Sequence, residues 1–370
     1  MSKNKIQINT GSKSYPIFFG NKILNNTGKI IKKRLPGVKR VAIIYDKNVP
    51  IIFLKKLNKS LKSYRPKVYK ITATEKNKNF IFAQMLIEKI LRDNLSRSDC
   101  IVSLGGGITG DLSAFVSNLI KRGIKFINIP TTLLAQVDAS IGGKTAVNSR
   151  QGKNLIGTFY QPDFVLIDIS ILKSLPRREM ICGYGEILKH SLILNRNFFL
   201  WLYKNAKKII NNRNKKIAKL AIIESCKIKS KIVSRDEKEK NLRMILNFGH
   251  TFAHGFEGAS NFSKKLNHGE AVLLGMMVAS QLSSNIKLLP ENDLRLIKKH
   301  YAELKLPMKI SKFFPKTKIN EIVSFMRKDK KNSNDKINLI LIKKIGKVAK
   351  AKTFSFKNNE IKKFLNQYYN

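Results

Sequence analysis

The chain has 370 residues, 43% of them hydrophobic, and carries 72 Lys and Arg against 24 Asp and Glu, a formal net charge of +48. This length is sufficient for two ordinary domains, each with its own buried core. Residues 1–20 contain no continuous apolar segment of the secretory type, and the longest apolar run, around residues 271–280, is far shorter than a membrane span. We therefore expect a soluble protein with no membrane contact.

The positive charge raises nucleic acid as a partner, because a strongly basic surface gathers polyanions. However, the excess is mostly Lys, is spread along the chain and accompanies many Ile and Asn residues, as expected from codons rich in A and T. The sequence has no zinc-finger spacing and no aromatic RNA-binding strand. We expect a solvated basic surface and no specific nucleic acid partner.

The cysteines predict the cellular compartment. Cys100, Cys182 and Cys226 stand far apart and lack the paired spacing of a metal site. Such usage is typical of a reducing compartment, and we expect the protein in the cytoplasm.

The first half of the chain alternates predicted strands and helices. Short, apolar, β-branched segments between turn residues predict buried strands at residues 41–45, 100–104, 126–129 and 164–167. Apolar residues at helical spacing predict helices at residues 81–91 and 112–120. This alternation is typical of a parallel α/β sheet.

The second half of the chain is predicted to be mainly helical. From about Arg178, helical patterns follow at residues 198–210, 217–233 and 270–288. Near the end, residues 337–342 and a turn at 343–346 predict a hairpin, and residues 360–368 a short amphipathic helix. We therefore expect an α/β dinucleotide-binding domain at residues 1–178 and a mainly α-helical metal-binding domain at residues 179–370.

A glycine-rich motif lies between the second predicted strand and the following helix. Gly105 to Gly110 fit the pattern G-x-G-x-x-G, which lets backbone N–H groups approach a pyrophosphate at a helix N-terminus. The acidic residue expected about twenty positions later is missing, since Asp138 is the next one after Asp111. The motif predicts a dinucleotide loop of a non-standard kind, and a plain glycine turn is the alternative.

Residues 130–145 and 152–157 form a predicted loop region rich in hydroxyls, glycines and two lysines, Lys144 and Lys153. This composition favours an anion or phosphate site. The alternative is a surface loop in a lysine-rich protein.

Three of the five histidines, His250, His254 and His268, are close in sequence, and Glu186 precedes them. Two imidazoles and one glutamate supply the three ligands of a catalytic zinc site, which keeps one open position. Ordinary buried histidines are the alternative. Helical spacing brings His250 and His254 to one face, but the spacing equally allows His250 and His268 to bind the metal while His254 faces the substrate.

Helical spacing also groups charged donors. Glu186 and Lys189 are three residues apart, on one face of a helix. Arg243 and Asn247 precede His250 by seven and three residues, which again predicts one helical face. Their side chains offer fixed donors for a carboxylate or phosphate.

At these residues the chain resembles the 3-dehydroquinate synthases, sugar-phosphate cyclases of the shikimate pathway of aromatic amino acid biosynthesis. The family's motifs recur in the same order and spacing over nearly the whole chain. They are Tyr15-Pro16-Ile17, Asp46-Lys47-Asn48-Val49, Leu104-Gly105-Gly106-Gly107, Lys121-Arg122-Gly123-Ile124, residues 131–144, Gly152-Lys153-Asn154, Gly185-Glu186, Leu246-Asn247-Phe248-Gly249-His250 and His268-Gly269-Glu270.

The resemblance implies a homodimeric enzyme with an amino-terminal NAD-binding domain, a helical domain that holds zinc, with cobalt as the alternative ion, and an active site in the cleft between them. The implied metal ligands are Glu186, His250 and His268. The implied NAD contacts are Asp46, Asn48, Glu75, Lys78, Gly106, Gly107, Ile108, Asp111, Thr131, Thr132, Leu134, Lys144, Lys153 and Ser174. The implied catalytic and substrate-binding residues are Asp138, Lys144, Asn154, Lys189, Lys229, Arg243, Asn247 and His254, with Arg122 reaching across the dimer and either Lys330 or Lys331 at the phosphate.

The implied reaction is that of a carbon–oxygen lyase, which converts 3-deoxy-D-arabino-heptulosonate 7-phosphate to 3-dehydroquinate and phosphate. NAD is reduced and reoxidised within one turnover, and the metal acts as a Lewis acid. The nearest alternative is another NAD- and metal-dependent sugar-phosphate cyclase, such as a 2-deoxy-scyllo-inosose synthase. A polyol dehydrogenase would have no need of the phosphate donors, and a nucleic-acid-binding protein would leave the histidines unexplained.

Overall fold

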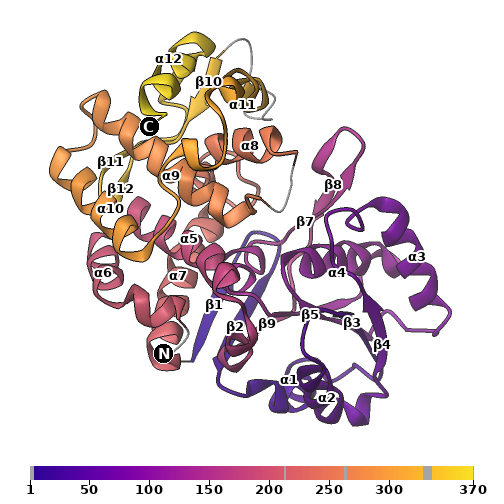
Figure 1. Ribbon diagram of the computed structural model, residues 1–370. Coiled ribbons are helices and arrows are strands. Elements are labelled where there is room, and N and C mark those ends of the chain that lie inside the picture. Colours follow the sequence, from indigo (N-terminus) through magenta and orange to yellow (C-terminus); the bar gives the residue numbers. More distant parts are fainter. Residues whose placement is uncertain (1–3, 212–213, 262–264, 328–335, 370) are drawn as a thin grey trace. The chain divides into compact units, whose positions relative to one another are not determined.

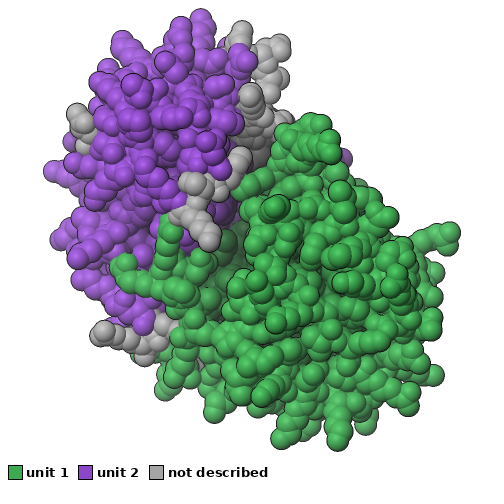
Figure 2. Space-filling view, turned by 45° about the vertical axis from the view of Figure 1, so that its right-hand side comes forward, with its two compact units in different colours: residues 1–180, 214–238 green, residues 181–213, 239–370 purple. Residues whose placement is uncertain are grey.

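The computed structural model describes residues 4–211, 214–261, 265–327 and 336–369 (Figure 1). The chain folds into two compact units, coloured separately in Figure 2. Unit 1 comprises residues 1–180 and 214–238, and unit 2 comprises residues 181–213 and 239–370. Unit 1 is an α/β unit and unit 2 is mainly helical, as the sequence predicts.

Unit 1 is built on a twisted sheet that is parallel except at one edge. In spatial order its strands are β1 (Lys5–Asn9), β2 (Ser14–Gly20), β9 (Phe164–Asp168), β6 (Lys125–Pro130), β5 (Cys100–Gly105), β3 (Val41–Asp46) and β4 (Lys67–Ile71). Only β1 runs antiparallel to its neighbour among these strands. All four predicted strands are present, as β3, β5, β6 and β9.

Both faces of this sheet are covered, which explains its continuous apolar strands. Along β3, Val41, Ile43 and Tyr45 belong to one core cluster and Ala42 and Ile44 to another, because successive side chains point to opposite faces. The helices α1 (Thr27–Arg34) and α2 (Ile51–Ser60) contribute to the first cluster. The helices α3 (Phe80–Leu91) and α4 (Gly107–Leu119) contribute to the second.

A separate hairpin, β7 (Lys144–Ser149) and β8 (Gly152–Phe159), extends from unit 1 (Figure 1). The sequence analysis predicted residues 130–145 and 152–157 as a loop region, and that prediction is wrong for residues 144–145 and 152–157, which lie in these strands. Residues 135–139 likewise form a π-helical turn, η4 (Ala135–Ala139). Glycine and polar content suggested a loop, but backbone pairing across the hairpin satisfies the same groups.

The helix α7 (Lys215–Arg235) belongs to unit 1, although the sequence analysis placed it in the second domain. It contacts β1, η4 and η5 (Ile169–Ser174). Its Cys226 Sγ lies 3.4 Å from the carbonyl oxygen of Gln136. Hydrophobic periodicity identifies a helix but says nothing of which unit the helix packs against.

Unit 2 consists mainly of helices: α5 (Arg177–Leu194, whose first residues belong to unit 1), α6 (Arg196–Ile210), α8 (His250–Ala259), α9 (His268–Asn285), α10 (Glu291–Leu304), α11 (Ile319–Arg327) and α12 (Asn358–Tyr368). The predicted carboxy-terminal hairpin is present only in part, as the short pair β11 (Ile342–Lys344) and β12 (Lys347–Val348), while the first half of the predicted strand pairs further along the chain. That half is β10 (Lys336–Leu339), which pairs with β13 (Phe354–Lys357). In the described part of the chain, no helix is long and apolar enough to cross a membrane.

Candidate active site

Glu186, His250 and His268 converge in unit 2, and each offers a ligand atom within 4.8 Å of the others. They come from α5, α8 and α9, respectively. Nε2 of His250 lies 3.6 Å from Oε1 of Glu186. The structure therefore brings together the three residues that the sequence analysis predicted as metal ligands.

Two glycines allow these three helices to approach. A Cβ atom at Gly269, next to His268, would lie 2.3 Å from Cα of Cys182, one helical turn before Glu186. Gly249, next to His250, has a φ of 80°, and a Cβ atom there would lie 2.7 Å from the backbone nitrogen of Met276 in α9. Glu186, His250 and His268 meet because the residues next to the two histidines have no side chains.

Local contacts determine which ring nitrogen carries the proton in His250 and His268. Nδ1 of His250 lies 3.3 Å from the carbonyl oxygen of Phe248, which can only accept, so Nδ1 carries the proton. Nδ1 of His268 lies 3.3 Å from Oε2 of Glu257. In both residues Nε2 is then the nitrogen available to a metal.

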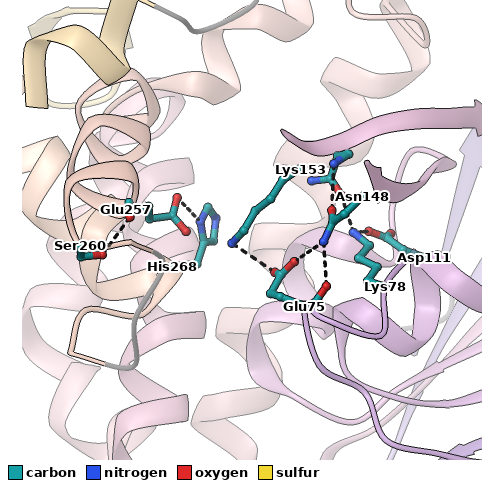
Figure 3. A network of polar contacts seen from close by, with 9 residues as sticks. Glu75, Lys78, Asp111, Asn148, Lys153, Glu257, Ser260 and His268 are labelled. Atoms are coloured by element: carbon teal, nitrogen blue, oxygen red, sulfur yellow. Dashed lines mark hydrogen bonds and ion pairs between the residues drawn. The ribbon is translucent and has the colours of Figure 1, made fainter. Parts of the chain in front are cut away.

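Glu257 also changes the basicity of His268. Desolvation alone would lower the pKa of His268, but the negative charge of Glu257 and its hydrogen bond outweigh that effect and raise the pKa. A carboxylate behind a ligating imidazole strengthens it as a ligand. Glu257 and His268 are drawn in Figure 3.

The environment of Glu186 fits a divalent cation. Its side chain is 1% exposed and the ammonium group of Lys189 forms an ion pair with Oε2, whereas Oε1 has no hydrogen-bond partner among the described residues. A buried carboxylate without hydrogen bonds is costly unless another charge satisfies it. With two imidazoles beside it, the donor set is that of a catalytic zinc site.

His254 lies on the same helix as His250, with 6.0 Å between the ring centroids. The group of possible ligand atoms that contains His250 includes His268 and does not include His254. Of the two alternatives that spacing allowed, the geometry thus favours the pair His250 and His268. His254 is left for a role outside that group.

The residues predicted to contact NAD gather in unit 1 at the carboxyl ends of the parallel strands, where α/β folds bind ligands. Gly106, Gly107, Ile108 and Asp111 begin α4 after β5. The others follow β3 (Asp46, Asn48), β4 (Glu75, Lys78), β6 (Thr131, Thr132, Leu134) and β9 (Ser174), while Lys144 and Lys153 lie on the hairpin. The glycine motif stands between a strand and a helix, as predicted.

Several of these side chains form one polar network (Figure 3). Nζ of Lys78 lies 2.5 Å from both Oδ2 of Asp111 and Oδ1 of Asn154. Lys153 forms an ion pair with Glu75, with 3.5 Å between Nζ and Oε1. Burial raises the pKa of Asp111, and the Lys78 ammonium opposes that rise.

Asp138 and Lys229, both predicted to meet substrate, lie together in unit 1. Nζ of Lys229 donates to the carbonyl oxygen and to Oδ1 of Asp138, at 2.7 and 2.6 Å. The side chain of Lys229 is only 6% exposed. Arg122 lies apart in a turn after α4, with a φ of 60°, and is exposed.

The remaining predicted substrate residues belong to unit 2. Lys189 lies on α5 beside Glu186, as the three-residue spacing predicts. The prediction of one helical face for Arg243, Asn247 and His250 is wrong, because the turn η6 (Leu242–Asn247) ends before Gly249, whose left-handed backbone starts a new helix. Lys330 and Lys331 lie outside the described residues.

The structure adds three residues that the sequence analysis missed. Glu239 Oε1 accepts a hydrogen bond from Nδ2 of Asn247 at 2.7 Å, Glu257 contacts His268, and Asn148 joins the network of Figure 3. Glu257 follows His250 by seven residues, so helical spacing offered a signal for it. Glu239 and Asn148 carry no such signal, because their partners come from other segments.

Comparisons with known proteins agree with this arrangement. A family model described as "3-dehydroquinate synthase N-terminal" matches residues 68–182, and one described as "3-dehydroquinate synthase C-terminal" matches residues 183–332. A 3-dehydroquinate synthase from Pelagibacter ubique is 50% identical over 92% of this chain and 93% of its own length.

Two solved structures share the fold. A 2-deoxy-scyllo-inosose synthase complexed with carbaglucose-6-phosphate, NAD⁺ and Co²⁺ has a TM-score of 0.85 and 26% identity, covering 98% of this chain and 99% of its own. The 2-epi-5-epi-valiolone synthase ValA from Streptomyces hygroscopicus, with NAD⁺ and Zn²⁺ bound, has a TM-score of 0.83 and 24% identity, covering 96% and 97%.

An α/β unit followed by a mainly helical unit is the fold that this chain shares with these sugar-phosphate cyclases. Within that class, the matches over both halves of the sequence are specific. The chain belongs to the 3-dehydroquinate synthase family.

Proposed function

We propose that this chain converts 3-deoxy-D-arabino-heptulosonate 7-phosphate to 3-dehydroquinate and inorganic phosphate, as a carbon–oxygen lyase of the shikimate pathway. The observation that carries the proposal is the convergence of Glu186, His250 and His268 in a chain whose two halves both match this family. Those residues would hold zinc or cobalt. The carboxyl edge of the unit 1 sheet would hold NAD.

When bound, NAD would accept and return a hydride while the metal polarises the reacting alcohol. The protein's own contribution is to bind and orient one flexible, highly charged molecule. Lys144, Asn154, Arg122, Arg243 and His254 would bind its phosphate and carboxylate groups electrostatically.

Two existing ion pairs prepare donors for this task. Lys229 is held by Asp138 and Lys189 by Glu186, so both ammonium groups are buried and oriented before any ligand arrives. A donor fixed in advance has less conformational entropy to lose when substrate binds. The substrate lysine near residue 330 stays a prediction.

The assembly and location follow from the family and stay proposals. We propose a homodimer in which Arg122 reaches the partner's phosphate site, in the cytoplasm, with no specific nucleic acid partner. The functional division remains residues 1–178 for NAD and 179–370 for metal and substrate, with α7 contributing Lys229 from within unit 1.

The test is direct. Purified protein is incubated with the heptulosonate phosphate, NAD and zinc, and dehydroquinate, inorganic phosphate and NADH are measured. We expect equal amounts of dehydroquinate and phosphate with no net NADH. In a parallel incubation with glucose 6-phosphate in place of the heptulosonate phosphate, formation of an inosose would identify the alternative cyclase, and accumulation of NADH in either incubation would identify a dehydrogenase.

A further inference from the structure

Asn148 joins two segments of unit 1 that are far apart in sequence. Its Nδ2 donates to the carbonyl oxygen and to Oε2 of Glu75, at 3.0 and 2.9 Å. Its Oδ1 accepts a hydrogen bond from the backbone N–H of Asn154 at 3.0 Å. Its own backbone N–H donates to the carbonyl oxygen of Lys78 at 2.7 Å. One residue thus binds both the segment after β4 and the tip of the hairpin (Figure 3).

The hairpin needs such a contact at this position. In the register of β7 and β8, Val147 pairs with Ile156 and Ser149 with Gly152, so residues 153–155 stand opposite Asn148 alone. This bulge removes the regular strand pairing there. Asn154 within it has a φ of 56°, a left-handed conformation that Asn tolerates better than most residues. The side chain of Asn148 replaces a missing ladder bond.

The two joined segments carry groups that act together. Lys153 forms an ion pair with Glu75, and Oδ1 of Asn154 lies 2.5 Å from Nζ of Lys78. In the proposed function, Glu75, Lys78 and Lys153 contact NAD, and Asn154 contacts substrate. The spacing between these four side chains depends on the backbone bonds that Asn148 makes to both segments.

We propose that Asn148 is a positioning residue that sets the NAD contacts and the substrate contact of unit 1 at a fixed spacing. The role for the ligands rests on the proposed function, whereas the joining of the two segments does not. The residue type follows from the geometry, because a carboxamide presents a donor and an acceptor at one end. Asp keeps the acceptor for Asn154 but loses the donor and repels the Glu75 carboxylate, and Ala loses both.

The test compares Asn148→Ala, Asn148→Asp and Ser149→Ala. Ser149 is the matched control, since its Oγ accepts from the N–H of Gln151 and donates to the carbonyl oxygen of Gly152, so that among the described residues it bonds within the hairpin and not to the segment after β4. Two quantities are measured: the rate of tryptic cleavage after Arg150 and Lys153, followed by mass spectrometry, and the dissociation constant of NAD. Bound zinc and Tm serve as controls for the rest of the fold.

Loss of two or three hydrogen bonds predicts that Asn148→Ala speeds cleavage and weakens NAD binding by about tenfold each. Asn148→Asp should lie between Asn148→Ala and the wild type in cleavage, because the bond to Asn154 remains. Ser149→Ala should match the wild type, and zinc content should be unchanged throughout. If Asn148→Ala does not fold, the same comparison is made between Asn148→Asp and the control Ser149→Ala.

Wild-type cleavage and NAD affinity in Asn148→Ala would overturn the proposal, and so would equal effects in Ser149→Ala. A change in the cleavage rate without a change in NAD affinity would overturn the claim that Asn148 positions the side chains that contact NAD. If the wild-type protein binds no NAD, the proposed function fails, while the cleavage rates still decide whether Asn148 joins the two segments.

Discussion

Oε2 of Glu257 lies 3.3 Å from Nδ1 of His268, a contact between helices α8 and α9 that turns Nε2 of the imidazole toward the metal group. Replacing the carboxylate by an amide keeps its shape but removes its charge. We expect Glu257→Gln to lower zinc affinity about 10- to 100-fold, as measured by competition with a chelator. Glu303→Gln, whose partner is Tyr203, is the control and should bind zinc normally.

Removing the proposed ligand Glu186 should lower zinc binding more than removing the charge of Glu257, which only supports His268. Glu186→Ala takes away the buried carboxylate of the group, and we expect the purified variant to contain no stoichiometric zinc and to have no measurable turnover. Metal analysis and the dehydroquinate assay check the two parts separately. Turnover in a metal-free Glu186→Ala protein would exclude Glu186 as a ligand.

The close approach of α9 and α5 gives a steric prediction. A methyl group at Gly269 would overlap the backbone of Cys182, so Gly269→Ala should lower the free energy of unfolding by about 1–3 kcal/mol and reduce zinc occupancy. Gly37→Ala is the control, because a Cβ atom there has no neighbour within 4 Å. Its effect should stay within about 0.5 kcal/mol. Equal stabilities for the two variants in urea unfolding would contradict the packing argument.

His300 predicts a specific loss of stability in acid. It is 1% exposed, its Nε2 lies 2.6 Å from the hydroxyl of Tyr184, and Phe199 and Tyr203 pack against its ring. Burial lowers the pKa of His300 from 6.5 to about 4, and the nearby Glu303 only partly opposes this.

Because the folded pKa lies below the unfolded one, the unfolded chain binds the proton first as the pH falls. The resulting stability is complete above about pH 6.5 and is lost towards pH 4, by about 3 kcal/mol. His300→Gln should lose that much less between pH 7 and pH 4 in urea unfolding. Parallel pH profiles for wild type and variant would show that His300 is not the responsible group.

Lys144 starts the strand β7 and is exposed, so its replacement should leave the fold intact. We expect Lys144→Met to keep its zinc and Tm but to raise KM for the heptulosonate phosphate or lower kcat by at least about tenfold, since a charged hydrogen bond is lost. Unchanged steady-state kinetics would remove Lys144 from the site.

The sequence predicted those parts of the fold that depend on local patterns. The strands β3, β5, β6 and β9 are continuous apolar segments, and the glycine motif between β5 and α4 has its own signature. Glu186, His250 and His268 were predicted as metal ligands because histidine is scarce in the chain and three of the five histidines are close in sequence. Their convergence depends on Gly249 and Gly269. The sequence shows that these residues are small but not which helix each of them contacts.

The features that the sequence did not predict depend on contacts between distant segments. Nothing in the spacing of residues 336–357 distinguishes the pairing of β10 with β13 from a simple hairpin. Likewise, the hydrogen bonds of Asn148 to Glu75 and Asn154 could not be predicted, because they form only when the segment after β4 lies beside β7. Non-local pairing of this kind leaves no period in the sequence.

The assignment of α7 to unit 1 has a consequence for synthesis on the ribosome. Unit 1 is interrupted by residues 181–213, so it lacks a helix until residue 238 has left the exit tunnel. Chains emerge from the ribosome at about 5–20 residues per second. The sheet therefore stays without the contact between α7 and β1 while the first helices of unit 2 are translated. A gene fragment that stops near residue 180 would therefore encode an incomplete body, and truncation for crystallography or expression should retain the chain at least through Lys238.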